Sequence, residues 1–132
     1  MAKKVLIIED QADNRLIYQT ALEHYGYEVL TAADGATGID LAFRHMPDLI
    51  LLDISLPKVT GWEIAETLRS DPSTSNITII GVTAHAYPAD RARAKELGFD
   101  GYLTKPVVPR DVHAEVEKWI GPAKDAGSDD AA

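Results

Sequence analysis

The chain has 132 residues, 45% of them hydrophobic, and a formal net charge of −8 at pH 7. This length fits one domain with a single hydrophobic core, and the composition excludes a chain that is disordered throughout. The absence of cysteine excludes disulfides and cysteine metal sites and fits a reducing compartment, so we expect a cytoplasmic protein. The acidic balance disfavours direct binding of nucleic acid. No apolar run is long enough to cross a membrane.

The first half of the chain alternates apolar runs with helical patterns. Residues 5–8 and 28–32 predict strands, while residues 13–25 and a segment ending at Pro47 predict helices. Each helix is expected to turn inward an apolar face with the spacing i, i+3, i+4 and i+7. In the first helix this face comprises Tyr18, Ala21, Leu22 and Tyr25. In the second helix it comprises Ile39, Ala42, Phe43 and Met46.

The second half of the chain continues the alternation. Strands are predicted over residues 48–53, 77–82 and 101–104. A helix after Gly61 has an inward face of Ile64, Ala65 and Leu68, and an alanine-rich helix covers residues 89–97. The inward face of the last helix comprises Val112, Val116, Trp119 and Ile120.

Five strands alternating with five helices predict an α/β fold with a mostly parallel sheet that is covered on both faces. The domain is expected to span residues 1–121. Residues 122–132 form a short acidic tail that we expect to be disordered.

Polar side chains stand at the ends of the predicted strands. Glu9 and Asp10 follow the first strand, Asp53 ends the third, Thr83 follows the fourth and Lys105 follows the fifth. Each of these residues alone more often has a structural role, such as capping a helix or facing solvent. Sites in parallel sheets form at the carboxyl ends of the strands, so we expect these residues to converge. Clustered carboxylates need a cation, which Lys105 and a hard divalent ion such as Mg²⁺ could supply.

Five short motifs occur in order along the chain: Ile8-Glu9-Asp10, Leu51-Leu52-Asp53, Leu56-Pro57 with Gly61, Thr83-Ala84 and Lys105-Pro106. Together they resemble the signature of receiver domains of bacterial two-component response regulators, over about residues 4–120. The resemblance implies a flavodoxin-like, doubly wound sheet of five parallel strands in the order 2-1-3-4-5 with five helices. Single-domain regulators of the chemotaxis type are the expected relatives, because no effector domain follows Ile120.

The resemblance also implies a role for each site residue. Asp53 would accept a phosphoryl group from a phosphohistidine on a sensor histidine kinase or a histidine phosphotransfer protein. Asp10, Asp53 and the backbone carbonyl of Ser55 would hold Mg²⁺, and Glu9 would act mainly through the water shell of the ion. Lys105 would neutralise charge on the phosphoryl oxygens, aided by a cis peptide bond between Lys105 and Pro106.

By the same resemblance, Thr83 and Tyr102 form a switch pair. The Thr83 hydroxyl would turn toward the phosphoryl group, and Tyr102 would rotate into the space that it leaves. The output would be binding of a protein partner, with no nucleic acid or membrane involved. The surface expected to receive this partner carries Arg91, Lys95, Tyr102, Arg110 and His113. The chain would be a signalling switch and not an enzyme, although it would promote its own phosphorylation and slow autodephosphorylation.

Three other functions remain open on the sequence alone. An aspartyl-nucleophile phosphatase or phosphotransferase would need an Asp two residues after the nucleophile, whereas Ser55 stands there. A flavin or nucleotide binder would need a glycine- or hydroxyl-rich loop after the first strand, where the chain is acidic. A pseudo-receiver that kept only the fold is disfavoured because every site residue is retained. His85 is a candidate general base or a loop residue, and Trp62 packs near its loop or anchors a partner.

Overall fold

Five parallel strands form one sheet in the order β2-β1-β3-β4-β5. The computed structural model describes residues 2–56, 58–84 and 87–124 of the chain. The strands are β1 (Lys4–Ile8), β2 (Glu28–Ala32), β3 (Leu49–Asp53), β4 (Thr78–Thr83) and β5 (Gly101–Thr104). The helices are α1 (Ala12–His24), α2 (Gly35–His45), α3 (Gly61–Ser70), α4 (Pro88–Glu96) and α5 (Pro109–Ile120). The α/β prediction and the strand order implied by the resemblance are therefore confirmed.

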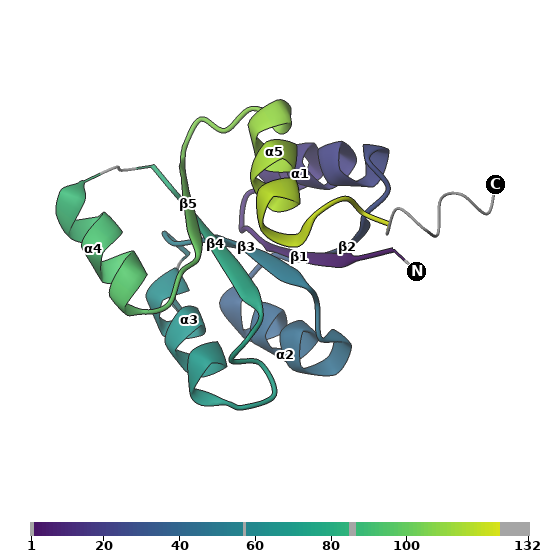
Figure 1. The fold of residues 1–132 in the computed structure, drawn as a ribbon. Helices are drawn as coiled ribbons and strands as arrows, with labels where there is room; N and C mark the ends of the chain where they lie inside the picture. The colour runs from purple at the N-terminus through teal and green to yellow at the C-terminus, as the bar shows by residue number, and fades with distance from the viewer. Residues whose placement is uncertain (1, 57, 85–86, 125–132) are drawn as a thin grey trace.

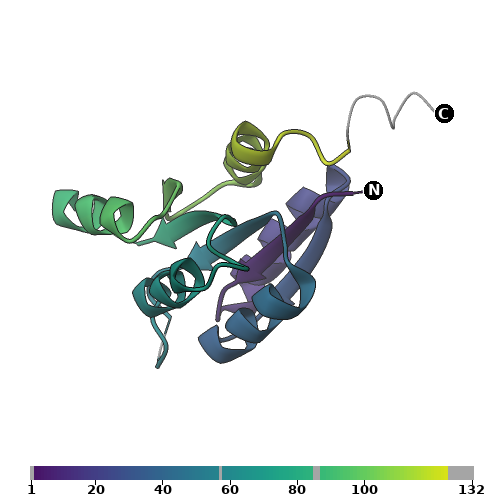
Figure 2. The same ribbon diagram turned by 60° about the horizontal axis from the view of Figure 1, so that its bottom comes forward.

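Helices cover both faces of the sheet, with α1 and α5 on one side and α2 and α3 on the other (Figure 1). The turned view shows the same layers, with α4 standing out at the β5 end of the sheet (Figure 2). Every residue of β3 is buried, because this strand lies in the middle of the sheet and both of its faces are covered. None of the helices in the described part of the chain is long and apolar enough to cross a bilayer.

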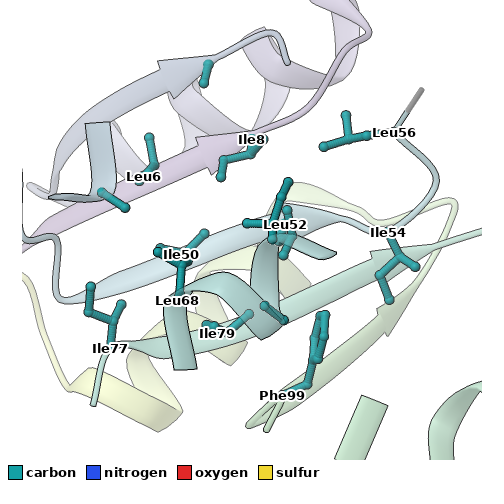
Figure 3. Close-up of a cluster of buried hydrophobic side chains, with 14 of the residues drawn as sticks. Leu6, Ile8, Ile50, Leu52, Ile54, Leu56, Leu68, Ile77, Ile79 and Phe99 are labelled. Atoms are coloured by element: carbon teal, nitrogen blue, oxygen red, sulfur yellow. The ribbon is translucent and has the colours of Figure 1, made fainter. Parts of the chain in front are cut away.

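Two hydrophobic clusters lie on opposite faces of the sheet, because successive side chains of a strand point to opposite sides. Leu6 and Ile8 of β1 pack with Ile64 and Leu68 of α3 in the cluster that Figure 3 shows in part. Val5 and Ile7 of the same strand belong to a second cluster. In that second cluster they join Tyr18, Leu22, Val112 and Val116 of α1 and α5.

The predicted inner face of α2 is partly wrong. Ala42 is buried, but Phe43 and Met46 are 37% and 45% exposed, and the buried positions are Gly35, Gly38 and Ala42. The reason is a close approach of α2 to β1. A Cβ atom at Gly38 would lie 2.5 Å from the Cδ1 atom and 2.8 Å from the Cγ1 atom of the buried Ile8, so any larger residue would force that side chain to shift.

Tyr25 and Trp119 were also predicted to point inward, and both predictions are wrong. Tyr25 is 49% exposed, because α1 ends at His24 and Tyr25 is already its C-terminal cap. Trp119 is 40% exposed and lies beside Gly101 of β5. β5 is one of the two edge strands, so no further strand lies beyond it to cover the indole.

The described chain continues past α5 and packs against the start of β1. The Lys3 amide donates to the Ala123 carbonyl at 2.8 Å, and the Tyr27 hydroxyl donates to the Gly121 carbonyl at 2.6 Å. Ala123 is 4% exposed. The domain boundary predicted at residue 121 stays a prediction, and residues 125–132 of the predicted tail lie outside the described residues.

Candidate functional site

The polar residues predicted from the strand ends come together at one edge of the sheet. In the parallel register Ile8 pairs with Leu52, and Thr83 pairs with Thr104, so the carboxyl ends of these strands are level. The residues that follow or end the strands are Glu9, Asp10, Asp53, Thr83 and Lys105. Convergence at the carboxyl ends is the arrangement expected for a site in a doubly wound sheet.

Three carboxylates form the centre of the site. Oxygen atoms of Glu9, Asp10 and Asp53 all lie within 4.8 Å of one another. Glu9 and Asp53 are 1% and 4% exposed, whereas Asp10 is exposed. The Lys105 ammonium lies 3.2 Å from Oε1 of Glu9 and 3.5 Å from Oδ2 of Asp53. The Lys105 ammonium therefore pairs with two of the three carboxylates, and the clustered acidic oxygens outnumber their ion-pair partners among the described residues.

Glu9 is the most perturbed group of the site. Burial raises its pKa to about 7, and the neighbouring Asp53 carboxylate adds to the effect, although the Gln11 amide and Lys105 act in the opposite direction. The Gln11 amide donates to Oε2 of Glu9 at 3.1 Å. Oε1 is buried and forms an ion pair with the Lys105 ammonium, but it accepts no hydrogen bond from the described residues. This oxygen therefore retains unused acceptor capacity.

Lys105 is held on the site by its backbone. Its amide donates to the Thr83 carbonyl at 2.7 Å, and its peptide bond to Pro106 is cis. Burial opposes the charge of the ammonium, but Asp53 and Glu9 outweigh burial and raise the pKa of Lys105 above its ordinary value. Lys105 is therefore a cation at neutral pH.

The Asp53 carboxylate is fixed by the loop that follows β3. The Ser55 amide donates to Oδ1 of Asp53 at 2.9 Å. Gly61, at the start of α3, packs directly on this loop, and a Cβ atom there would lie 2.6 Å from the Ile54 Cα atom and 2.9 Å from the Asp53 carbonyl. Gly61 thus allows α3 to begin against the backbone that carries Asp53.

The donor set suits a hard divalent cation. Mg²⁺ prefers oxygen ligands and is usually bound by one or two carboxylates together with waters. The site offers three clustered carboxylates, and no residue in the described part of the chain donates a hydrogen bond to the buried Oε1 of Glu9. The residues present therefore fit a magnesium ion, with Asp10 and Asp53 as the candidate ligands.

Thr83 and Tyr102 lie on adjacent strands near the site. Thr83 ends β4 and is 4% exposed, and Tyr102 is half-buried on β5 with the Arg91 guanidinium 5.3 Å from its ring centroid. Tyr102, Arg91 and Lys95 line one open groove between α4 and α5. Arg110 and His113 were predicted on the same surface, which is wrong. Arg110 lines a different hollow against α1, and the His113 ring stacks on Tyr25 at 3.5 Å.

Trp62 packs within the protein, as one of its two sequence interpretations proposed. Its ring meets Phe99 edge to face at 5.7 Å, and the Arg93 guanidinium lies 4.6 Å from its centroid. Pro57 and His85 lie outside the described residues.

The sequence interpretation missed one residue at the site. The Arg15 guanidinium donates to the carbonyls of both Glu9 and Asp10. An arginine near the start of a helix runs against the preference of helix N-termini for acidic residues, and this mismatch was the available signal.

Known proteins are similar to this chain in both sequence and fold. The model of the response regulator receiver domain matches residues 5–117. The chain is 38% identical over 124 residues to the polar-differentiation response regulator DivK of Brucella anthropi, covering 93% of this chain and 100% of that protein.

Solved structures agree. The chemotaxis protein CheY4 of Vibrio cholerae is 28% identical with a TM-score of 0.87, covering 90% of this chain and 99% of that one. The receiver domain of the sensor histidine kinase PA1611 of Pseudomonas aeruginosa, described with a magnesium ion in its active site cleft, is 30% identical with a TM-score of 0.83, covering 92% and 99%. The chain belongs to the response regulator receiver domain family of two-component signalling.

Proposed function

We propose that the chain is a phosphorylation switch in which Asp53 accepts a phosphoryl group from a phosphohistidine. The donor would be a sensor histidine kinase or a histidine phosphotransfer protein. The observation that carries the proposal is the buried Asp53 carboxylate, clustered with Glu9 and Asp10 and facing Lys105 at 3.5 Å. Membership of the receiver family and the likeness to a polar-differentiation response regulator support it.

In the proposed transfer, a carboxylate oxygen of Asp53 attacks phosphorus in line with the phosphorus–nitrogen bond. That bond breaks, its electron pair returns to the imidazole nitrogen, and an acyl phosphate forms on Asp53. Lys105 would contact the phosphoryl oxygens as their charge redistributes. When bound by Asp10, Asp53 and the Ser55 carbonyl, with Glu9 contacting its water shell, Mg²⁺ would supply further charge neutralisation.

The signal would pass through Thr83 and Tyr102. The Thr83 hydroxyl would turn to a phosphoryl oxygen, and its movement would open space for the Tyr102 ring. Thr83 lies on β4 and Tyr102 on the neighbouring edge strand β5. The backbone amide of Lys105 donates to the Thr83 carbonyl.

Beryllofluoride on Asp53, standing in for the phosphoryl group, should perturb amide resonances near Tyr102. Thr83→Ala should still bind beryllofluoride but lose much of the change near Tyr102, and an unchanged pattern would exclude this switch.

The output would be protein binding at the surface of α4, β5 and α5. A groove of about 610 Å³ there carries basic and acidic side chains around Tyr102 and Trp119, namely Arg91, Lys95, Lys118, Asp100 and Glu115. Mixed charge around aromatic rings suits a protein partner, and the total charge of −8 disfavours DNA. We also propose that the switch catalyses its own slow dephosphorylation and that the protein is cytoplasmic.

Phosphotransfer profiling tests the function as a whole. Each histidine kinase of the source organism is phosphorylated in vitro and mixed with the wild-type chain or with Asp53→Asn. The proposal requires that at least one kinase transfers label to the wild type and not to the variant. If no kinase or phosphotransfer protein transfers label to the wild type, the pseudo-receiver becomes the better reading.

A further inference from the structure

Arg15 is bound to the backbone of the acidic pair. It is the fourth residue of α1, and its Nη1 atom donates to the Glu9 carbonyl at 2.9 Å and to the Asp10 carbonyl at 3.2 Å. The half-buried side chain thus spans the short loop between β1 and α1, which contains both acidic residues.

The Arg15 guanidinium binds backbone carbonyls, although carboxylates lie nearby. The N-terminus of a helix carries a partial positive charge and disfavours cations. Three carboxylates gather nearby, yet the ion pairs found within residues 2–56, 58–84 and 87–124 do not include Arg15. Its guanidinium binds peptide carbonyls, so the carboxylate oxygens stay available for other ligands.

Binding two successive carbonyls restricts the direction of the side chains between them. When the peptide planes after Glu9 and after Asp10 are both fixed, the Cα–Cβ bond of Asp10 is fixed as well. Glu9 has other restraints, because its amide donates to the Ala32 carbonyl and its Oε2 accepts from the Gln11 amide. For Asp10, the hydrogen bond from Arg15 is the one found in the described part of the chain.

We infer that Arg15 is a positioning residue that holds the Asp10 carboxylate beside Asp53 in the arrangement that binds a divalent cation. This inference deepens the proposed function and rests on it. Groups that orient metal ligands without touching the metal commonly change metal affinity by about 10- to 100-fold when they are replaced. Arg15 would act in this way on Asp10, the exposed member of the three carboxylates.

Calorimetric titration with Mg²⁺ at fixed ionic strength measures how Arg15→Gln changes the affinity for Mg²⁺. The sign of that change shows whether Arg15 positions Asp10 or acts only through its charge. Arg15→Gln removes a positive charge close to the cation, so electrostatics alone would make Mg²⁺ bind more tightly. Loss of positioning makes it bind more weakly, and we expect an affinity about tenfold below that of the wild type. Arg15→Lys keeps the charge and can still donate to a carbonyl, but its ammonium lies on a shorter side chain, so it should recover part of the loss.

Arg44→Gln is the matched control, because this substitution removes the same positive charge at another place. Arg44 lies in the last turn of α2, where it pairs with Asp40 on the surface. Its Mg²⁺ affinity should stay within about twofold of the wild type, because an exposed charge distant from the site is screened. Melting temperatures are measured without Mg²⁺ on all variants. A lower melting temperature for Arg15→Gln with unchanged or tighter Mg²⁺ binding would overturn the inference and leave Arg15 a purely structural tether.

The outcomes for the wild type keep this inference distinct from the proposed function. Weak Mg²⁺ binding by Arg15→Gln beside normal binding by the wild type supports the positioning role even if Asp53 takes no phosphate. Absence of Mg²⁺ binding by the wild type itself overturns the inference together with the metal part of the proposed function.

Discussion

Three carboxylates and one lysine determine the chemistry of the site at the scale of single residues. Their convergence could be predicted from the sequence, because the carboxyl ends of adjacent parallel strands meet at one edge. Arg15 was missed because a long side chain that binds backbone carbonyls leaves no periodic pattern, and its sequence signal, a cation near the start of a helix, does not identify the groups that it binds. The contacts of Glu9 with Lys105 and with the Gln11 amide also required the structure.

Repulsion among the carboxylates predicts a specific response to Asp10→Asn. Without Mg²⁺ the variant should melt at a higher temperature than the wild type, because one of three clustered negative charges is gone. Added Mg²⁺ should raise the melting temperature of the wild type, since it binds the folded state alone, and should raise that of the variant less. Differential scanning calorimetry over a Mg²⁺ series at constant ionic strength measures both effects. Equal increments in the two proteins would exclude Asp10 as a ligand.

At the scale of elements, the order and type of helices and strands followed from hydrophobic periodicity. The orientation of α2 followed only in part, because Ile39 packs against the core and Ala42 is buried, whereas Phe43 and Met46 are exposed. The actual face is made of Gly35, Gly38 and Ala42, which allow the helix to approach β1 closely. Small residues carry little weight in a hydrophobic pattern, so close helix packing of this kind is easily missed.

Among the five helices, α4 has the fewest buried residues, and one of its contacts can be tested. Ala94 is its buried residue, and the Arg93 guanidinium lies over the Trp62 ring of α3 at 4.6 Å. Arg93→Ala should therefore lower the free energy of unfolding by about 0.5–1 kcal/mol and change the emission of Trp62. Urea titrations in a Trp119→Phe background isolate the Trp62 signal. Lys95→Ala, an exposed neighbour on the same helix, should leave that signal unchanged, and identical behaviour of the two variants would argue against the contact.

At the scale of the whole molecule, the strand order came from the family resemblance and was confirmed by the sheet. The packing of residues 121–124 on the start of β1 was not predicted. That segment is short and has neither hydrophobic periodicity nor a strand-like run, so its position depends on individual contacts such as the bond from Tyr27 to Gly121.

Because of Tyr27, the free energy of unfolding of the domain should fall as the pH rises above 10. Burial, with a smaller effect of Glu117, raises the pKa of Tyr27 from 10.0 to about 12. The native state retains the phenolic proton above pH 10 when the unfolded state has lost it, so this stabilisation is present below pH 10 and lost between pH 10 and 12. Between pH 8.5 and 10.8 the wild type should lose about 1 kcal/mol more unfolding free energy than Tyr27→Phe. Urea unfolding at both pH values measures the difference, and parallel losses would show that Tyr27 ionises normally.

The proposed function depends on phosphate uptake by Asp53, and intact-mass spectrometry measures that uptake directly. The wild type, Asp53→Asn and Asp48→Asn are incubated with a small phosphodonor and Mg²⁺. Asp48 precedes the opposite end of β3, where it accepts a hydrogen bond from the Lys4 amide, so its variant controls for the substitution itself. The wild type and Asp48→Asn should each gain the mass of one phosphoryl group, and Asp53→Asn should gain none. Equal uptake by all three proteins, or none by the wild type, would contradict the assignment of Asp53 as the acceptor.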